Sequence, residues 1–145
     1  MLNATNDQIH QALTQCRTIA VVGLSAQTSR PSFSVSQYMQ SHGYRIIPVN
    51  PRYAKEGVLI LGEKCYAELT DIEFEIDIVD VFRRTEDVMP IATQAVAMGA
   101  RVLWQQMGVV NLQAHHFAQA AGLLSVIDRC IKVDHDHLLH QGTPR

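Results

Sequence analysis

The chain has 145 residues, of which 47% are hydrophobic, 18% charged and 6% aromatic. A chain of this length and composition buries enough apolar surface for one hydrophobic core but not for two ordinary domains, so we expect a single domain. The net charge is -2, from 12 Lys and Arg against 14 Asp and Glu, which argues against general binding to nucleic acid. The three cysteines form no CxxC pair, so we expect free thiols rather than a disulfide framework or a zinc site.

The first residues predict a helix and no targeting signal. The segment MLNATNDQIHQALTQCR lacks a basic start and an apolar run, so we expect a cytoplasmic protein without a membrane partner. Ile9, Leu13 and Cys16 recur at helical spacing behind Thr5, whose hydroxyl can cap free backbone amides. This spacing predicts an N-terminal helix within residues 1–16 that packs outside the core.

Short apolar runs rich in β-branched residues predict five strands. These strands cover residues 18–22, 45–49, 76–82, 102–105 and 123–127. Helical spacing with start and stop signals predicts helices over residues 32–42, 85–98 and 111–121. The connection between the second and third strands is less regular: residues 58–61 fit a small strand or a turn, and residues 67–72 fit a helical turn.

The alternation of strands and helices predicts an α/β fold. We expect a single three-layer domain with a five-stranded parallel sheet in the order 3-2-1-4-5 and helices on both faces. The core is expected over residues 17–138, with a flexible tail over residues 139–145. A ligand is expected at the carboxyl ends of the strands, near the switch point between strands one and four.

Positive charge gathers in the segments predicted at the carboxyl edge. Seven of the 12 Lys and Arg residues lie there: Arg30, Arg52, Lys55, Arg83, Arg84, Arg129 and Lys132. Two interpretations stay open, namely ordinary solvated surface charge and an anion-binding mouth.

The ends of the first two strands narrow the ligand class. The loop from Gly23 to Pro31 joins a strand to a helix, where free amides favour a phosphate, but it contains neither GxGxxG nor GxxxxGK[ST]. Strand two ends at Asn50 without the acidic residue that holds the ribose diol of NAD. Arg52 and Lys55 instead suit a phosphorylated ribose, as in NADP or coenzyme A, although Asn50 followed by proline also fits a simple turn.

Five segments in this order carry a family resemblance: IAVVGLS, RPS, GYRIIPVNP, DIVDVFRR and IDRC. Together they resemble the small bacterial coenzyme A-binding proteins of the YccU type, over roughly Arg17 to Leu138. The Rossmann-like domain of that family is similar to the N-terminal domain of the succinyl-CoA synthetase α subunit. The resemblance implies that coenzyme A, or an acyl-coenzyme A, binds across the carboxyl edge.

The resemblance also implies which residues contact the ligand. Phosphate contacts are implied near Gly23, Leu24, Ser25, Arg30 and Ser32, and adenosine-side contacts near Asn50 and Pro51. Phe82, Arg83 and Arg84 are implied to line the cleft, with Gln106, Gly108 and Cys130 near the pantetheine side. Ile131 departs from the family pattern, in which proline often follows the cysteine. Synthetase activity is not implied, because the chain has no second domain to carry the phosphohistidine chemistry.

Other candidate groups receive structural interpretations. Asp80 is expected to accept amides from a neighbouring loop and to hold the mouth in shape. Residues 134–137, with sequence DHDH, and His140 imitate a metal cluster, but any metal binding there is expected to be adventitious. Cys130, flanked by Arg129 and Lys132, leaves a redox role with the coenzyme A thiol open.

The leading hypothesis is a non-catalytic binding or sensor protein for coenzyme A, a small-molecule nucleotide ligand. An NADP-linked oxidoreductase is the alternative, because it would use the same anion site. An additional protein partner is not identified by the sequence.

Overall fold

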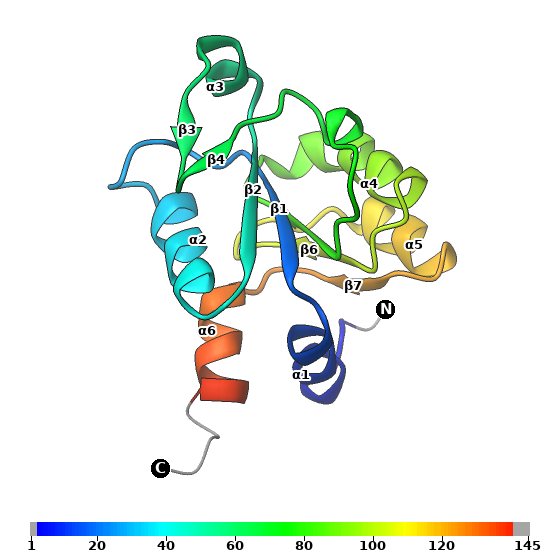
Figure 1. Ribbon diagram of the computed structural model, residues 1–145. Helices are drawn as coiled ribbons and strands as arrows, with labels where there is room; N and C mark the ends of the chain where they lie inside the picture. The colour runs from blue at the N-terminus through cyan, green and yellow to red at the C-terminus, as the bar shows by residue number, and fades with distance from the viewer. Residues whose placement is uncertain (1–2, 141–145) are drawn as a thin grey trace.

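Five parallel strands form the central sheet of the computed structural model, which describes residues 3–140. The strands are β1 (Thr18–Val22), β2 (Arg45–Val49), β5 (Ile78–Val81), β6 (Val102–Gln105) and β7 (Leu124–Val126). Their spatial order is β2-β1-β5-β6-β7, and all neighbouring pairs are parallel (Figure 1). The predicted α/β class and the five-stranded parallel sheet are therefore confirmed.

The predicted strand order 3-2-1-4-5 is wrong, because the third strand of the sheet, β5, pairs with β1 and not with β2. The carboxylate of Asp77, just before β5, accepts the backbone amides of Arg17 (2.8 Å) and Thr18 (3.2 Å) at the start of β1. The edge strand β2 contains Pro48, whose carbonyl accepts the amide of Tyr66 on the side away from β1. A further strand on that side would lack the amide donor that proline cannot supply, so β2 suits the sheet edge.

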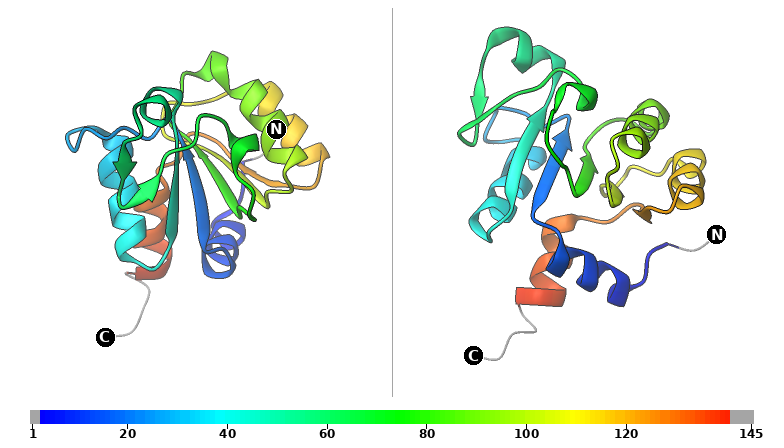
Figure 2. Two further views of the ribbon diagram at one scale, coloured as in Figure 1. Left: turned by 45° about the horizontal axis from the view of Figure 1, so that its top comes forward. Right: turned by 45° about the vertical axis from the view of Figure 1, so that its right-hand side comes forward.

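Helices cover both faces of the sheet (Figure 2). One face carries α1 (Asn6–Gln15), α2 (Pro31–Ser41) and α6 (Ile131–His135); the other carries η1 (Leu69–Asp71), η2 (Thr85–Asp87), α4 (Val88–Ala97) and α5 (Leu112–Ala120). Alternate residues of β1 serve the two layers: Ile19 and Val21 join the first core cluster, and Ala20 and Val22 join the second. This alternation is the period of a strand that is buried on both sides.

The N-terminal helix α1 belongs to the core, contrary to the expectation that it packs outside it. Ile9 and Leu13 are fully buried in the same cluster as β1. The helix begins with a capping box, in which the Thr5 hydroxyl accepts the Gln8 amide (3.1 Å) and the Gln8 side chain accepts the Thr5 amide (2.9 Å). The apolar stripe that predicted the helix therefore covers the sheet.

The irregular connection between β2 and β5 begins beyond the carboxyl end of β2 and then returns beside this edge strand (Figure 1). It contains α3 (Pro51–Glu56), β3 (Leu59–Ile60), β4 (Glu63–Lys64) and η1. β3 and β4 form an antiparallel hairpin, and η1 is the helical turn considered for residues 67–72. The helix α3 was not predicted, although Asn50 caps it by accepting the Arg52 amide (3.1 Å) and Pro51 occupies its first position.

The described helices are short. The longest, α2, has 11 residues, and no helix in residues 3–140 combines the length and the apolar character needed to cross a bilayer. After α6 the chain continues as the π-helical segment η3 (Asp136–His140). The tail predicted for residues 139–145 thus begins inside η3, and residues 141–145 lie outside the described part of the chain.

Gly23 is the point where β1 meets its neighbours at the carboxyl edge. Its φ angle is +92°, and its amide donates to the carbonyl of Val49 (2.8 Å) at the end of β2. A Cβ atom at this position would lie 2.2 Å from the carbonyl oxygen of Phe82, which follows β5. The position therefore excludes a side chain both by its backbone conformation and by the close approach of another strand end.

We predict that Gly23→Ala destabilises the protein far more than Gly43→Ala. Gly43 has the same kind of backbone, with φ +93°, but nothing lies within 4 Å of its Cβ position. Gly43→Ala should lower the free energy of unfolding by about 1–2 kcal/mol, the cost of a left-handed conformation, and Gly23→Ala by about 1–3 kcal/mol more because of the clash. Urea unfolding of both variants measures the difference; equal losses would contradict the close approach.

Candidate functional site

The order of the strands reverses at β1, although all five strands run in the same direction. From β1 the chain passes through α2 to β2 on one side, whereas from β5 it passes through α4 to β6 on the other side. The loops after β1 and β5 therefore diverge and leave a crevice at the switch point, where open α/β sheets bind ligands. The switch point was predicted between strands one and four; it lies between β1 and the third strand of the sheet, β5.

The first of three cavities at this edge lies beside the start of α2 and has a volume of about 350 Å³. This α2 cavity is lined by Gly23, Ser25, Gln27, Arg30, Pro31, Ser32, Asn50, Arg52, Tyr53 and Phe82. Its loop is held by side-chain hydroxyls, because the Ser25 amide donates to Ser32 Oγ (3.0 Å) and the Gln27 amide donates to Ser25 Oγ (3.0 Å). The helix α2 starts here at Pro31, so the positive end of its dipole lies at the cavity. No side chain caps this end of the helix.

Asn50 connects the loops on two sides of the α2 cavity. Its Nδ2 donates to the carbonyl of Leu24 (3.1 Å), while its Oδ1 caps α3. Its side-chain amide is thus used to join the first loop to the end of β2. Arg52 extends from the first turn of α3, 5.2 Å from the ring centre of Tyr53 and 3.8 Å from the carboxylate of Glu56.

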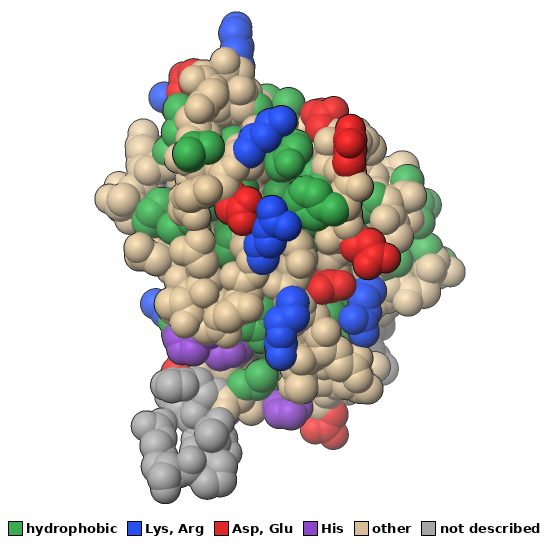
Figure 3. All heavy atoms as spheres, viewed as in Figure 1, with side chains coloured by type: hydrophobic (Ala, Val, Ile, Leu, Met, Phe, Trp, Pro, Cys, Tyr) green, Lys and Arg blue, Asp and Glu red, His purple; other side chains and the backbone are tan. Residues whose placement is uncertain are grey.

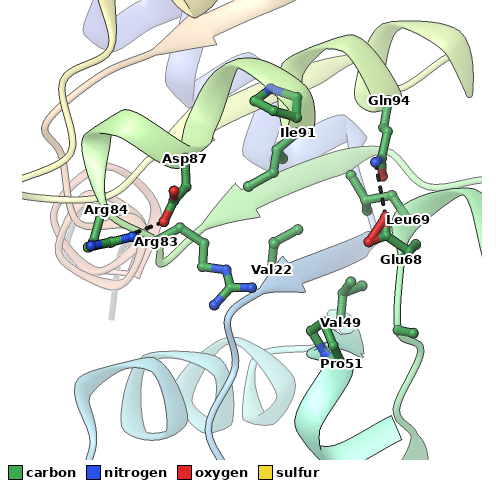
Figure 4. A pocket seen from close by; sticks show the side chains of 12 residues that line it. Val22, Val49, Pro51, Glu68, Leu69, Arg83, Arg84, Asp87, Ile91 and Gln94 are labelled. Carbon is green, nitrogen blue, oxygen red and sulfur yellow. Dashed lines mark hydrogen bonds and ion pairs between the residues drawn. The ribbon is translucent and has the colours of Figure 1, made fainter. Parts of the chain in front are cut away.

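The second cavity, of about 460 Å³, lies on the opposite face between the strand ends and α4 (Figure 4). This α4 cavity is lined by Val22, Val49, Pro51, Ala67, Glu68, Leu69, Arg83, Arg84, Asp87, Pro90, Ile91 and Gln94. Figure 4 shows aliphatic side chains from β1, β2 and α4 on its walls and the Arg83 side chain extending across it toward Val22. The Gln94 amide donates to Glu68 (3.2 Å) at one end, and Arg84 pairs with Asp87 (3.2 Å) at the other. The cavity therefore combines apolar walls with a polar rim.

The third cavity, of about 550 Å³, lies beside the loop after β6. This β6 cavity is lined by Phe82, Arg83, Arg84, Asp87, Gln106, Met107 and Val109. It shares Phe82 with the α2 cavity, and Arg83, Arg84 and Asp87 with the α4 cavity. The loop after β5 thus borders all three cavities, so they are neighbours at the carboxyl edge. We refer to the three cavities together as the groove.

Charge pairing singles out two arginines of the groove. Among the described residues, neither Arg30 nor Arg83 has a carboxylate within the 4.0 Å of an ion pair, whereas Arg52 and Arg84 do. Arg30 Nε donates only to the neutral side chain of Gln27 (3.3 Å). An exposed cation without a nearby carboxylate keeps its full attraction for an anion, so Arg30 and Arg83 are the strongest candidates for ligand phosphates.

A buried carboxyl group supports the β6 cavity from below. Asp80 in β5 is 1% exposed, and its Oδ1 accepts a hydrogen bond from Gln106 Nε2 (2.5 Å). The expected role of Asp80 as an acceptor for a neighbouring loop is thus confirmed, with a side-chain amide as the donor. Burial disfavours the charged form and raises the pKa of Asp80 to about 7, although the hydrogen bond from Gln106 acts in the opposite direction.

Most residues implied by the family resemblance meet in the groove. Ten of them line a cavity: Gly23, Ser25, Arg30, Ser32, Asn50, Pro51, Phe82, Arg83, Arg84 and Gln106. Leu24 is fully buried, while Gly108 and Cys130 line none of these three cavities. The Gly108 amide instead donates to the carboxylate of Asp128 (2.7 Å).

The surroundings of Cys130 differ from those expected for an activated thiol. Cys130 is partly buried and precedes α6. The guanidinium of Arg129 makes two 2.8 Å hydrogen bonds to the Asp134 carboxylate, and Lys132 Nζ lies 5.4 Å from the ring centre of Tyr38. Both flanking cations thus interact with other side chains, and neither Arg129 nor Lys132 lines one of the three cavities.

The other two thiols and the DHDH segment are also accounted for structurally. Cys16 and Cys65 are buried, and burial raises the pKa of both thiols. Within residues 134–137, Asp134 pairs with an arginine and His135 Nδ1 lies 3.0 Å from the Tyr38 hydroxyl. Over the described range, no three His, Cys, Asp or Glu side chains are grouped to hold a metal ion.

Sequence reasoning missed several lining residues. Tyr53 is one: it is buried in α3 with its hydroxyl 3.4 Å from Ser25 Oγ. Interpreting Asn50 and Pro51 as a helix start instead of a turn would have placed Tyr53 on the first turn facing the loop. Glu68 and Gln94 carried no comparable signal, because only the packing of η1 against α4 brings them together.

Comparison with known proteins identifies the class. The family model described as CoA binding domain matches residues 17–136, so the chain belongs to this family and the resemblance is confirmed. It is 41% identical to the uncharacterized protein YneT of Bacillus subtilis, over 93% of this chain and 97% of that protein. The solved structure of a hypothetical protein from Pyrococcus horikoshii OT3 superposes with a TM-score of 0.88 at 38% identity, over 94% of this chain and 93% of that one.

A larger enzyme shares part of the sequence. Over 62 residues, 43% of this chain, the sequence is 27% identical to an acetate–CoA ligase (ADP-forming) of Methanocaldococcus jannaschii. The match spans only 8% of that enzyme. The similarity is therefore limited to one region of the ligase, and the activity of the whole enzyme is not transferred to this chain.

We predict that Asp80→Asn removes a pH dependence of stability. The folded protein holds a proton on Asp80 up to about pH 7, whereas the unfolded chain releases it near the ordinary pKa of 3.8. The free energy of unfolding should therefore fall as the pH rises from about 4 to 7, by an amount on the order of a few kcal/mol, and stay level above that range. The variant should lack this fall.

Urea unfolding at several pH values between 4 and 8 measures the effect. Asp7→Asn is the control, because it removes an exposed carboxylate from the first turn of α1. Parallel profiles for wild type and Asp80→Asn would show that the buried carboxyl does not hold its proton.

Proposed function

We propose that this protein binds coenzyme A along the groove at the carboxyl edge and acts as a binding protein without a reaction of its own. The observation that carries the proposal is the arrangement of three cavities around the loop after β5, which contributes lining residues to each of them. A long ligand with a nucleotide at one end and a flexible arm at the other suits such a groove. Membership of the CoA binding domain family supports the same ligand.

In this proposal the diphosphate lies in the α2 cavity. Arg30 offers a guanidinium that has no carboxylate partner within residues 3–140, and the start of α2 adds the positive end of its dipole. The loop after β1 is held in place at this cavity because the Gly23 amide donates to the Val49 carbonyl (2.8 Å). Arg83 approaches the strand ends from the other face, where it is positioned to share the phosphate charge.

The adenosine lies at the end of β2. Adenine is flat and apolar on both faces, which suits the aliphatic walls formed by Val22, Val49 and Ile91 in the α4 cavity. Arg52, at the start of α3, is assigned to the 3′-phosphate on the ribose, because strand two ends in Asn50 and offers no carboxylate for a free ribose diol.

The two alternatives gain less support. An NADP-linked oxidoreductase would use the same arginines, but the matched family model describes binding of coenzyme A. A redox role for Cys130 would need the thiol at the groove, and Cys130 lines none of its three cavities.

We predict that Arg30→Gln and Arg83→Gln each weaken coenzyme A binding by about tenfold or more, since each removes a charge-assisted contact to a phosphate. Isothermal titration calorimetry measures the dissociation constants. Arg101→Gln is the matched control, because Arg101 is exposed at the opposite, amino edge and bonds to Gln15 (3.0 Å). Equal effects of all three substitutions would contradict a site at the carboxyl edge.

We also predict that coenzyme A binds about tenfold more tightly than its 3′-dephospho form, and that Arg52→Gln abolishes this preference. Loss of either the phosphate or the guanidinium removes the same ion pair, so the two changes should not add. Titration of wild type and variant with both ligands completes the cycle. Equal affinity of the wild type for the two ligands would refute the assignment of Arg52 to the 3′-phosphate.

A further inference from the structure

Exposed apolar side chains gather beside the β6 cavity. Seven large hydrophobic residues are exposed in the described part of the chain, and three of them fall within residues 107–112, in the loop after β6 and at the start of α5. They are Met107, 67% exposed, Val110, 38%, and Leu112, 48%. We call these three side chains the apolar rim. Surface apolar residues that occur singly need no explanation, whereas a cluster beside a cavity indicates a binding surface.

The apolar rim stands on a firmly held loop. The Asn111 amide donates to Gln105 Oε1 (2.7 Å), and Gln105 Nε2 donates back to the Asn111 carbonyl (3.1 Å). Asn111 Nδ2 donates to the Thr85 carbonyl (2.9 Å), and the Val110 amide donates to Thr85 Oγ1 (3.2 Å). These bonds fasten the loop to the end of β6 and to η2, so the loop cannot turn its apolar side chains inward without breaking them.

One residue of the apolar rim, Met107, also lines the groove. Met107 and Val109 line the β6 cavity together with Phe82, which also borders the α2 cavity. In the space-filling view, Lys and Arg side chains are spread over the face that is seen in Figure 1, and several of them lie close to acidic side chains (Figure 3). The charge of Arg84, on the opposite side of the β6 cavity, is offset by Asp87 (3.2 Å). The β6 cavity, lined by Arg83, Arg84 and Asp87, is therefore less cationic than the α2 cavity, whose lining has two arginines and no carboxylate.

We propose that the ligand is an acyl-coenzyme A whose acyl group is an unbranched apolar chain lying against Met107, Val109 and Val110. This inference rests on the proposed function, which places the nucleotide in the α2 and α4 cavities and leaves the β6 cavity for the distal end of the pantetheine arm. The thioester then emerges where the groove becomes apolar. A chain of four to eight carbons covers surface that is otherwise exposed to water, and this burial supplies the selectivity.

The test is a titration series with coenzyme A and its acetyl, butyryl, hexanoyl and octanoyl thioesters, measured by calorimetry on the full chain. Each added methylene should tighten binding by about twofold to fourfold, the range for a partly to fully buried methylene. Met107→Ser should flatten this dependence, judged by the ratio of each thioester's affinity to the same variant's affinity for coenzyme A, and Met107→Leu should restore it. Leu59→Ser is the control, because Leu59 is equally exposed, at 64%, on the β3–β4 hairpin.

The outcomes separate the inference from the proposed function. Binding of coenzyme A with no gain along the series would overturn the acyl assignment and leave coenzyme A binding in place, whereas no binding of any member would overturn both. Tighter binding of succinyl-coenzyme A than of butyryl-coenzyme A would also overturn it, since it would indicate recognition of a carboxylate by the arginines. A wild-type dimer that Met107→Ser dissociates, together with a flat series, would assign the apolar rim to a second copy of the chain.

Discussion

The close approach of three strand ends is the constraint on which the carboxyl edge depends. Gly23 donates its amide to the end of β2, while the carbonyl of Phe82 occupies the space where a Cβ would otherwise stand. The Phe82 amide also donates to the carbonyl of Val22 (2.9 Å), so β1 is joined on both sides up to its last residue. Because the chain leaves β1 and β5 toward opposite faces, this tight junction is also the place where the loops diverge and the groove opens.

The distribution of charge pairs gives the groove its electrostatic character in a chain with a net charge of -2. Arg84 and Arg129 have close acidic partners, at 3.2 Å and 2.8 Å, and contribute little free positive charge. Arg30 and Arg83 approach the junction without such partners among residues 3–140. Counting cations along the sequence therefore overstates the positive charge of the edge, and the pairing pattern decides where an anion is attracted.

Polarity changes along the groove, and the change suits a ligand with two chemically different ends. The α2 cavity has hydroxyls, arginines and the start of a helix, whereas the β6 cavity adds the apolar side chains of Met107 and Val109 to its arginines and Asp87. The loops that line both ends are held by side-chain hydrogen bonds, including those of Asn50 and Asn111. A groove of this kind is preorganised, so binding loses less conformational entropy than closure of mobile loops would require.

The sequence by itself determined the elements and their class, because strand and helix periods, caps and glycine stops are local signals: the five strands and the helix behind Thr5 follow from them. It also identified most of the groove, since carboxyl ends of parallel strands share one edge whatever their order. Only the tertiary structure decided that β5 lies beside β1, which depends on contacts such as that of Asp77 with Arg17, 60 residues apart. The tertiary structure also decided which cations are paired, where α1 packs and where Cys130 lies relative to the groove. Each of these features depends on which distant side chains meet after folding.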